Sequence, residues 1–267
     1  MLKDITLGQF MPGDTVVHRL DPRVKLILTV LYIVGLFMAK GIISYVLMLL
    51  WLVSAIALSR IKLRIVLSGM KPLIFIVVFT GALNIFYTQG RILAEWWIFR
   101  ITYEGLTAAG FMIARIIMLI TGSFLLTYTT SPIMLTDGIE RLLGPLKRIR
   151  VPVHELAMMM TIALRFIPTL IEETDKIMSA QRARGADFES GNILRRAKAL
   201  VPLLVPLFVS AFRRADDLAM AMECRCYHGG EGRTRLKQLR YAARDYAALA
   251  IFICATAGSI TLGVFGL

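Results

Sequence analysis

Ser179-Ala-Gln-Arg-Ala-Arg-Gly185 is the stretch around which the rest of the chain is organised. The residues before it have helical periodicity, and Gly185 is a natural helix terminator because glycine adopts positive φ at little cost. A second version, Ala221-Met-Glu-Cys-Arg-Cys226, places its arginine 41 positions later. Aligned on the arginine, both stretches read Ala-x-x-x-Arg-small. The sequence therefore predicts two arginine-tipped helix ends that make two contacts with a partner.

The composition is that of a membrane protein with one charged insert. The 267 residues are 57% hydrophobic, and the mean hydropathy is +0.68, well above that of soluble domains. The formal net charge is +13, but residues 131–245 hold 19 of the 31 Lys and Arg and 13 of the 18 Asp and Glu. A basic chain often binds nucleic acid, but here the apolar runs favour positive-inside membrane topology instead.

Long uncharged runs predict the membrane spans. Lys40 is the only charge between Lys25 and Arg60, so we expect two helices that turn near Lys40-Gly41 rather than one helix too long for the bilayer. Arg115 is the only charge between Glu104 and Asp137. The resulting prediction is an all-α integral membrane protein with about five transmembrane helices, at 26–39, 41–59, 72–90, 107–129 and 246–267, plus a cytoplasmic insert of amphipathic coupling helices.

The positive-inside rule gives the orientation. A basic loop (Arg60, Lys62, Arg64 and Lys71) and the insert are expected in the cytoplasm, and the connection at about 88–107 with Trp96-Trp97 outside. The N-terminus is then cytoplasmic and the C-terminus outside. We divide the chain into a cytoplasmic N-terminal segment with spans one to four (1–130), the coupling-helix region (131–245) and the last span (246–267). The apolar run 156–171 contains Arg165, and we expect it at or under the membrane surface.

Helix signals divide the insert into segments. Ser131-Pro132 begins a short amphipathic helix that ends before Gly144-Pro145. A long amphipathic helix is predicted from Pro152 to Arg184, kinked at Pro168. A further unit opens at 190–198, Pro202 and Pro206 break or bend it, and another helix runs from 207 to 225. A flexible basic loop is expected at 229–235.

The two arginines have a structural and a functional interpretation. A cation in the last turn of a helix is favoured by the helix dipole by about 0.3–1 kcal/mol, so one such arginine needs no partner. Repetition with small neighbours favours a contact, because a guanidinium between small residues can enter a narrow groove and form forked hydrogen bonds. Cys224-x-Cys226-x-His228 could instead bind a metal, but its spacing is too tight for the usual structural zinc patterns.

Three regions of the chain resemble the transmembrane T component of the energy-coupling factor (ECF) transporter family. They are Gly8-x-Phe-x-Pro-Gly with His-Arg-Leu-Asp-Pro-Arg23; Arg165-Phe-Ile-Pro with Glu172-Glu and Ala-Gln-Arg-Ala-Arg-Gly185; and Ala221-Met-Glu-Cys-Arg-Cys-Tyr-His-Gly-Gly-Glu-Gly-Arg-Thr-Arg235. The order of spans and insert is similar as well. Cys224 departs from the family pattern, which more often has alanine before the second arginine, but cysteine is also small and largely apolar.

The resemblance implies a coupling function. In this family the T component of a bacterial plasma-membrane importer lies between two cytoplasmic ATP-binding cassette ATPases and a membrane S component, which binds a vitamin or other micronutrient. The resemblance assigns the ATPase-coupling role to two arginine motifs, here Ala183-Arg184-Gly185 and Cys224-Arg225-Cys226. Each arginine would dock in one ATPase groove. ATP-driven movement would then tip the S component, and this chain would hydrolyse nothing.

The residues themselves fit a chain without its own cofactor. The sequence has no Gly-x-x-x-x-Gly-Lys-Ser/Thr loop, so we expect ATP to be bound by the partner ATPases, with no cofactor, catalytic residue or metal site in this chain. An integral-membrane enzyme, such as a lipid-modifying transferase, is the alternative, but His18, His154 and His228 are scattered. A self-contained carrier is a third possibility, and it would need charged or broken helices at mid-membrane.

Overall fold

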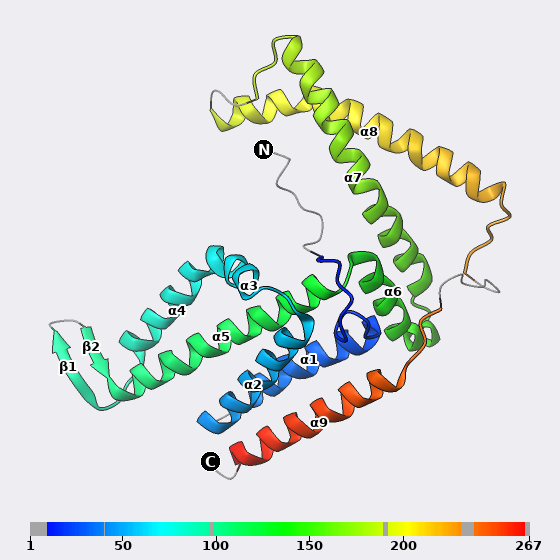
Figure 1. Cartoon of the computed structure of the whole chain (residues 1–267). Helices are drawn as coiled ribbons and strands as arrows, with labels where there is room; N and C mark the ends of the chain where they lie inside the picture. The colour runs from blue at the N-terminus through cyan, green and yellow to red at the C-terminus, as the bar shows by residue number, and fades with distance from the viewer. Residues whose placement is uncertain (1–9, 40, 97–98, 189–191, 231–237, 265–267) are drawn as a thin grey trace. The chain divides into compact units, whose positions relative to one another are not determined.

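The computed structural model describes residues 10–39, 41–96, 99–188, 192–230 and 238–264. The predicted loop 229–235 and the pair Trp96-Trp97 lie partly outside these residues. The helices in chain order are α1 (Pro22–Met38), α2 (Ile42–Ser59), α3 (Leu63–Met70), α4 (Ile74–Tyr87), α5 (Tyr103–Thr129), α6 (Pro132–Leu142), α7 (Val153–Ala183), α8 (Ile193–Glu223) and α9 (Ala243–Val264) (Figure 1). The helical fold class is confirmed.

Four short elements complete the described structure. Two 3-10 helices cover Lys71–Leu73 and Gly144–Ile149. Strands β1 (Ile92–Trp96) and β2 (Phe99–Thr102) pair antiparallel between α4 and α5, where the sequence predicted only a connection (Figure 1). The described chain divides into two compact units: one contains α1–α5 and α9, the other contains α7 and α8, and the division falls within α6.

Helix α1 begins where the sequence places a cap and a proline. Asp21 is the N-cap residue, its carboxylate accepts a hydrogen bond from the Arg23 amide, and Pro22 is the first helical residue. Burial raises the pKa of the Asp21 carboxyl, but the hydrogen bonds and charge of Arg23 outweigh burial and hold that pKa below its ordinary value. α1 ends at Met38 and α2 begins at Ile42, which confirms the two-helix prediction.

The first unit packs α1 against α5 and α9, and α2 against α9. Its core is apolar and includes Tyr32, Leu36, Met48 and Phe252. Gly122 on α5 allows this approach, because a Cβ atom there would lie 2.7 Å from Cε1 of Tyr32. At one end of the bundle the buried Asp245 carboxylate accepts hydrogen bonds from the Asp21 amide (2.9 Å) and the Ala242 amide (2.7 Å). This carboxylate joins the start of α9 to the start of α1.

The segment predicted as a basic loop is partly helical. Arg60 ends α2 with φ 54°, and α3 begins after Lys62. Val66 on α3 is buried with Leu125 and Tyr128 of α5, and this packing explains why the segment folds against the bundle. The loop prediction was therefore wrong, because it weighed the basic residues and overlooked the apolar stripe between them.

Four helical segments of the described chain are long and apolar enough to cross a membrane: Ile42–Ser59, Leu63–Tyr87, Tyr103–Thr129 and Val153–Ala183. The first three correspond to predicted spans. α1, with 17 residues, and α9, with 22, are not among the four. The fourth segment is α7, which includes the run 156–171, so its expected position at the membrane surface stays a prediction.

Candidate functional site

Helix α7 ends in a Schellman motif with an arginine at its cap. The Gly185 amide donates to the Arg182 carbonyl at 3.0 Å, and the Ala186 amide donates to the Gln181 carbonyl at 3.0 Å. Gly185 has φ 87°, in the left-handed half of the map that glycine enters without strain. Arg184 is the C-cap residue, one position before the left-handed residue Gly185. The predicted helix end is confirmed.

Helix α8 ends in the same way. The Cys226 amide donates to the Glu223 carbonyl at 2.8 Å, and the Tyr227 amide donates to the Met222 carbonyl at 3.0 Å. Cys226 has φ 56° and takes the place that Gly185 has in α7. Arg225 again lies one position before the left-handed residue. Every donor and acceptor of the second motif is 41 positions after its counterpart in the first, so the backbone repeats the sequence similarity.

Both arginines are exposed and available to a partner. Ala183, Arg184 and Gly185 are exposed at one end, and Cys224, Arg225 and Cys226 are exposed at the other. Within the parts of the chain that the structure describes, neither the Arg184 nor the Arg225 side chain has a hydrogen-bond or ion-pair partner. Each guanidinium therefore keeps all its donors for a carboxylate or carbonyl groups outside this chain.

Helix α7 matches its predicted range closely, whereas α8 is longer and more continuous than expected. α7 and α8 each have 31 residues, and both are continuous through their prolines. Of the predicted break or bend at Pro202 and Pro206, the break was therefore wrong, and the bend stays a prediction. Leu203, between these two prolines, is buried, and α8 packs against α7, so tertiary contacts outweigh the local cost of the two prolines.

An ion pair joins the two helices at equivalent positions. Arg214 Nη2 on α8 donates to Glu173 Oε2 on α7 at 2.9 Å. Arg214 follows Glu173 by the same 41 positions that separate the two arginine tips. From this contact each tip is eleven residues away, roughly 16 Å at 1.5 Å per residue. The sequence analysis missed this pair, although the 41-residue offset could have found it.

The cysteines and histidines do not form a metal centre within the described residues. No group of three or more His, Cys, Asp or Glu side chains there is placed to hold a metal ion. Cys224, Cys226 and Cys254 are exposed free cysteines. Cys226 instead supplies the left-handed residue of the second helix end, and this structural role accounts for its place in the motif.

Comparisons with known proteins agree with this architecture. The model of the CbiQ family, described as cobalt transport protein, matches residues 13–236. The energy-coupling factor transporter transmembrane protein EcfT of Thermosediminibacter oceani is 57% identical over 97% of this chain and 98% of its own length. The protein of the same name from Ruminiclostridium cellulolyticum is 54% identical over 95% of each chain. The one from Bacillus subtilis is 48% identical over 95% of this chain and 96% of its own.

The family model spans both arginine motifs and helices α1 to α8, and it ends before α9 begins. These matches confirm the resemblance derived from the motifs. The chain therefore belongs to the family of energy-coupling factor transporter transmembrane proteins.

Proposed function

We propose that this transport protein, which is not an enzyme, couples two cytoplasmic ATP-binding cassette ATPases to a membrane S component. The S component binds a vitamin or another micronutrient, and the ATPases bind the ATP, so this chain needs no cofactor of its own. The proposed setting is a bacterial plasma membrane. The N-terminus and the α7–α8 pair are cytoplasmic, and the C-terminus is outside.

The repeated arginine-capped helix end is the observation that carries the proposal. Two Schellman motifs with the same hydrogen-bond pattern, each with an exposed arginine between small residues, suit two similar grooves on a pair of ATPases. A charge-assisted hydrogen bond contributes about 1.5–3 kcal/mol, so each arginine would be a major part of its contact. The small neighbours Ala183 and Gly185, or Cys224 and Cys226, let a narrow groove close around the guanidinium.

The α7–α8 pair has the features needed to transmit movement. Each helix is a continuous rod of 31 residues, and the Glu173–Arg214 ion pair links them at equal distances from their tips. Movement of the two ATPases toward and away from each other would change the separation of the tips. The shared contact would convert that change into a rotation of one rod against the other, which the S component would follow.

Charge reversal tests the proposal. The variants Arg184→Glu, Arg225→Glu and the double variant are expressed with the ATPases and the S component. Each single variant should reduce ATPase co-purification and vitamin uptake by about tenfold or more, because loss of one charge-assisted contact costs at least ~1.4 kcal/mol. The double variant should abolish both.

The matched control is Arg196→Glu, an exposed arginine on α8 far from its tip. It should leave assembly and uptake unchanged, which separates the motif from general charge. Normal assembly and uptake by the double variant would overturn the proposal. Equal loss in the control would also overturn it, because the effect would then belong to surface charge.

A further inference from the structure

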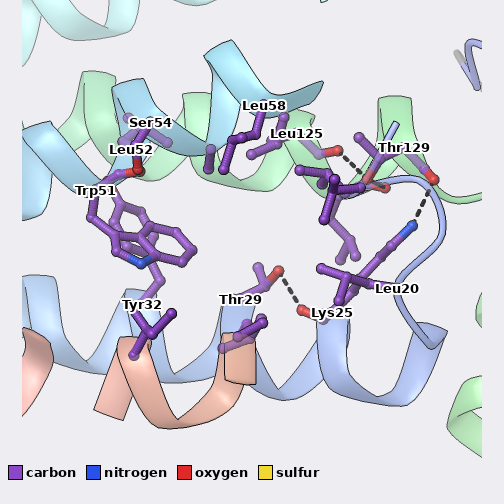
Figure 2. Close-up of a pocket in the computed structure, with 18 of the residues that line it drawn as sticks. Leu20, Lys25, Thr29, Tyr32, Trp51, Leu52, Ser54, Leu58, Leu125 and Thr129 are labelled. Carbon is purple, nitrogen blue, oxygen red and sulfur yellow. Dashed lines mark hydrogen bonds between the residues drawn. The ribbon is translucent and has the colours of Figure 1, made fainter. Parts of the chain in front are cut away.

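An apolar pocket of about 380 Å³ lies in the first unit, between α1, α2, α5 and α9 (Figure 2). Its volume is in the range of small ligand sites. The wall is mainly hydrocarbon and aromatic, with Tyr32 and Trp51 at one end and Lys25 at the other (Figure 2). Leu58 and Ile251 line it and are exposed, so the pocket opens to the surroundings of the bundle.

Three polar side chains of the wall, those of Lys25, Thr29 and Ser54, already have partners inside the protein. Lys25 Nζ donates to the carbonyls of Thr129 (2.8 Å) and His18 (3.1 Å) and lies 3.2 Å from Thr130 Oγ1. The Thr29 hydroxyl donates to the Lys25 carbonyl at 2.8 Å (Figure 2). The Ser54 hydroxyl donates to the Trp51 carbonyl at 2.7 Å. These polar side chains are satisfied within the protein and the rest of the wall is mainly apolar, so the interior suits a hydrocarbon chain.

A cation stands at the exposed side of this pocket. Arg244 lines the pocket, is exposed, and has no ion-pair partner among the residues described. It lies in the first turn of α9, where the helix dipole disfavours a positive charge, so its position does not stabilise the helix. Arg60, two positions after the pocket residue Leu58, adds a second exposed cation at the end of α2.

We propose that the pocket binds an anionic glycerophospholipid, with one acyl chain inside and the phosphate group at Arg244. The acyl chain exchanges one hydrocarbon environment for another, so packing in the pocket and the headgroup contact, rather than the hydrophobic effect, hold the lipid. Basic pockets between transmembrane helices recognise anionic headgroups, and one Arg near the surface is worth about 1 kcal/mol. The charge at the rim selects an anionic lipid over a zwitterionic one, which the apolar pocket alone would not do.

Native mass spectrometry of the purified, delipidated transporter complex tests this inference. The complex is titrated with phosphatidylglycerol or phosphatidylcholine of the same acyl chains. We expect the wild type to retain phosphatidylglycerol about fivefold more strongly, since ~1 kcal/mol corresponds to that ratio. Arg244→Gln should remove the preference and leave phosphatidylcholine binding unchanged. Ala247→Phe, at an exposed pocket position, should reduce the binding of both lipids.

The matched control is Arg240→Gln, an exposed arginine four positions earlier that does not line the pocket. It should preserve the preference. Equal retention of the two lipids by the wild type would overturn the proposal. An equal effect of Arg240→Gln and Arg244→Gln would overturn it too, because the lipid would then respond to general surface charge. Unchanged binding in Ala247→Phe would show that the acyl chain lies elsewhere.

Discussion

The bundle of the first unit and the α7–α8 pair use polar residues in opposite ways. In the bundle, Lys25 and Asp245 are buried and hydrogen-bonded to other elements of the same unit. In the pair, Arg184 and Arg225 at the helix ends are exposed and have no hydrogen-bond or ion-pair partner among the described residues. The two regions also differ in how much of each helix is buried. In the most apolar 18-residue stretch of α5, 28% of the residues are buried, but in that of α7 only 6% are. The bundle is therefore stabilised from within, whereas α7 has few buried residues and the pair depends more on its own helical geometry.

This difference shows where movement can occur. A region with few buried contacts opens or shifts at low cost, whereas a packed core moves as one body. Loops and helix ends held by such a scaffold are common places for binding residues. Substitutions in the bundle should therefore change stability most, and substitutions in the pair should change coupling more than stability.

The largest stability effect is expected for Lys25→Met in the bundle. Methionine keeps the length of the side chain but leaves the buried carbonyl of Thr129 without its donor. An unsatisfied buried polar group costs about 1–3 kcal/mol, and three hydrogen bonds are lost here, so we expect a loss of about 3 kcal/mol. Thermal unfolding of the purified complex, followed by circular dichroism, measures the change.

Lys176→Met on α7 is the matched control in the other region. Lys176 is exposed and should tolerate the change within about 0.5 kcal/mol, as most surface substitutions do. Similar losses in both variants would contradict the contrast between a bundle stabilised from within and a loosely packed pair.

A smaller effect, about 1 kcal/mol, is expected at the helix ends. Cys226, at φ 56°, lies inside the left-handed region that other residues can occupy, whereas Gly185, at φ 87°, lies beyond it. Gly185→Ala should therefore destabilise the end of α7 by about 1 kcal/mol. Cys226→Gly should change α8 by less than about 0.5 kcal/mol, because relief of strain is offset by the entropy of glycine.

Hydrogen exchange of the Ala186 and Tyr227 amides reports these changes, because each amide closes its own Schellman motif. The Ala186 amide should exchange severalfold faster in Gly185→Ala, and the Tyr227 amide should stay nearly as protected in Cys226→Gly. If the Tyr227 amide in Cys226→Gly is accelerated more than the Ala186 amide in Gly185→Ala, position 185 does not require glycine.

The sequence predicted local features better than packing. The helix start at Ser131-Pro132 and the helix end at Gly185 were predicted, because caps, prolines and glycines act through nearby backbone groups. The start of α1 at Pro22 was not predicted, since the first span was expected from residue 26. The continuity of α8 through Pro202 was not, because it depends on burial of Leu203. The arginine motifs were found from the sequence alone.

Long-range contacts account for what was missed. Helix α3 forms in a segment rich in basic residues because Val66 packs on α5. Neither this contact nor the three bonds of Lys25 can be derived from spacing along the chain. The Glu173–Arg214 pair could have been predicted only in part. Its 41-residue offset is visible in the sequence, but the ion pair follows from it only once α7 and α8 are known to be in contact.

A small stability effect is also expected at this ion pair, and its effect on uptake tests the pair as a mechanical link. Glu173 and Arg214 are partly exposed, with side-chain exposures of 22% and 38%, so their interaction should contribute no more than about 1 kcal/mol. Glu173→Arg and Arg214→Glu alone should leave ATPase co-purification intact and reduce uptake, because the tips remain but the link is lost. The double variant restores opposite charges and should recover part of the uptake. Recovery of uptake in the double variant would show that the two residues act as a link and not as two separate surface charges. If the effects of the two single variants on uptake simply add in the double variant, the interaction energy is zero and the helices transmit movement without this contact.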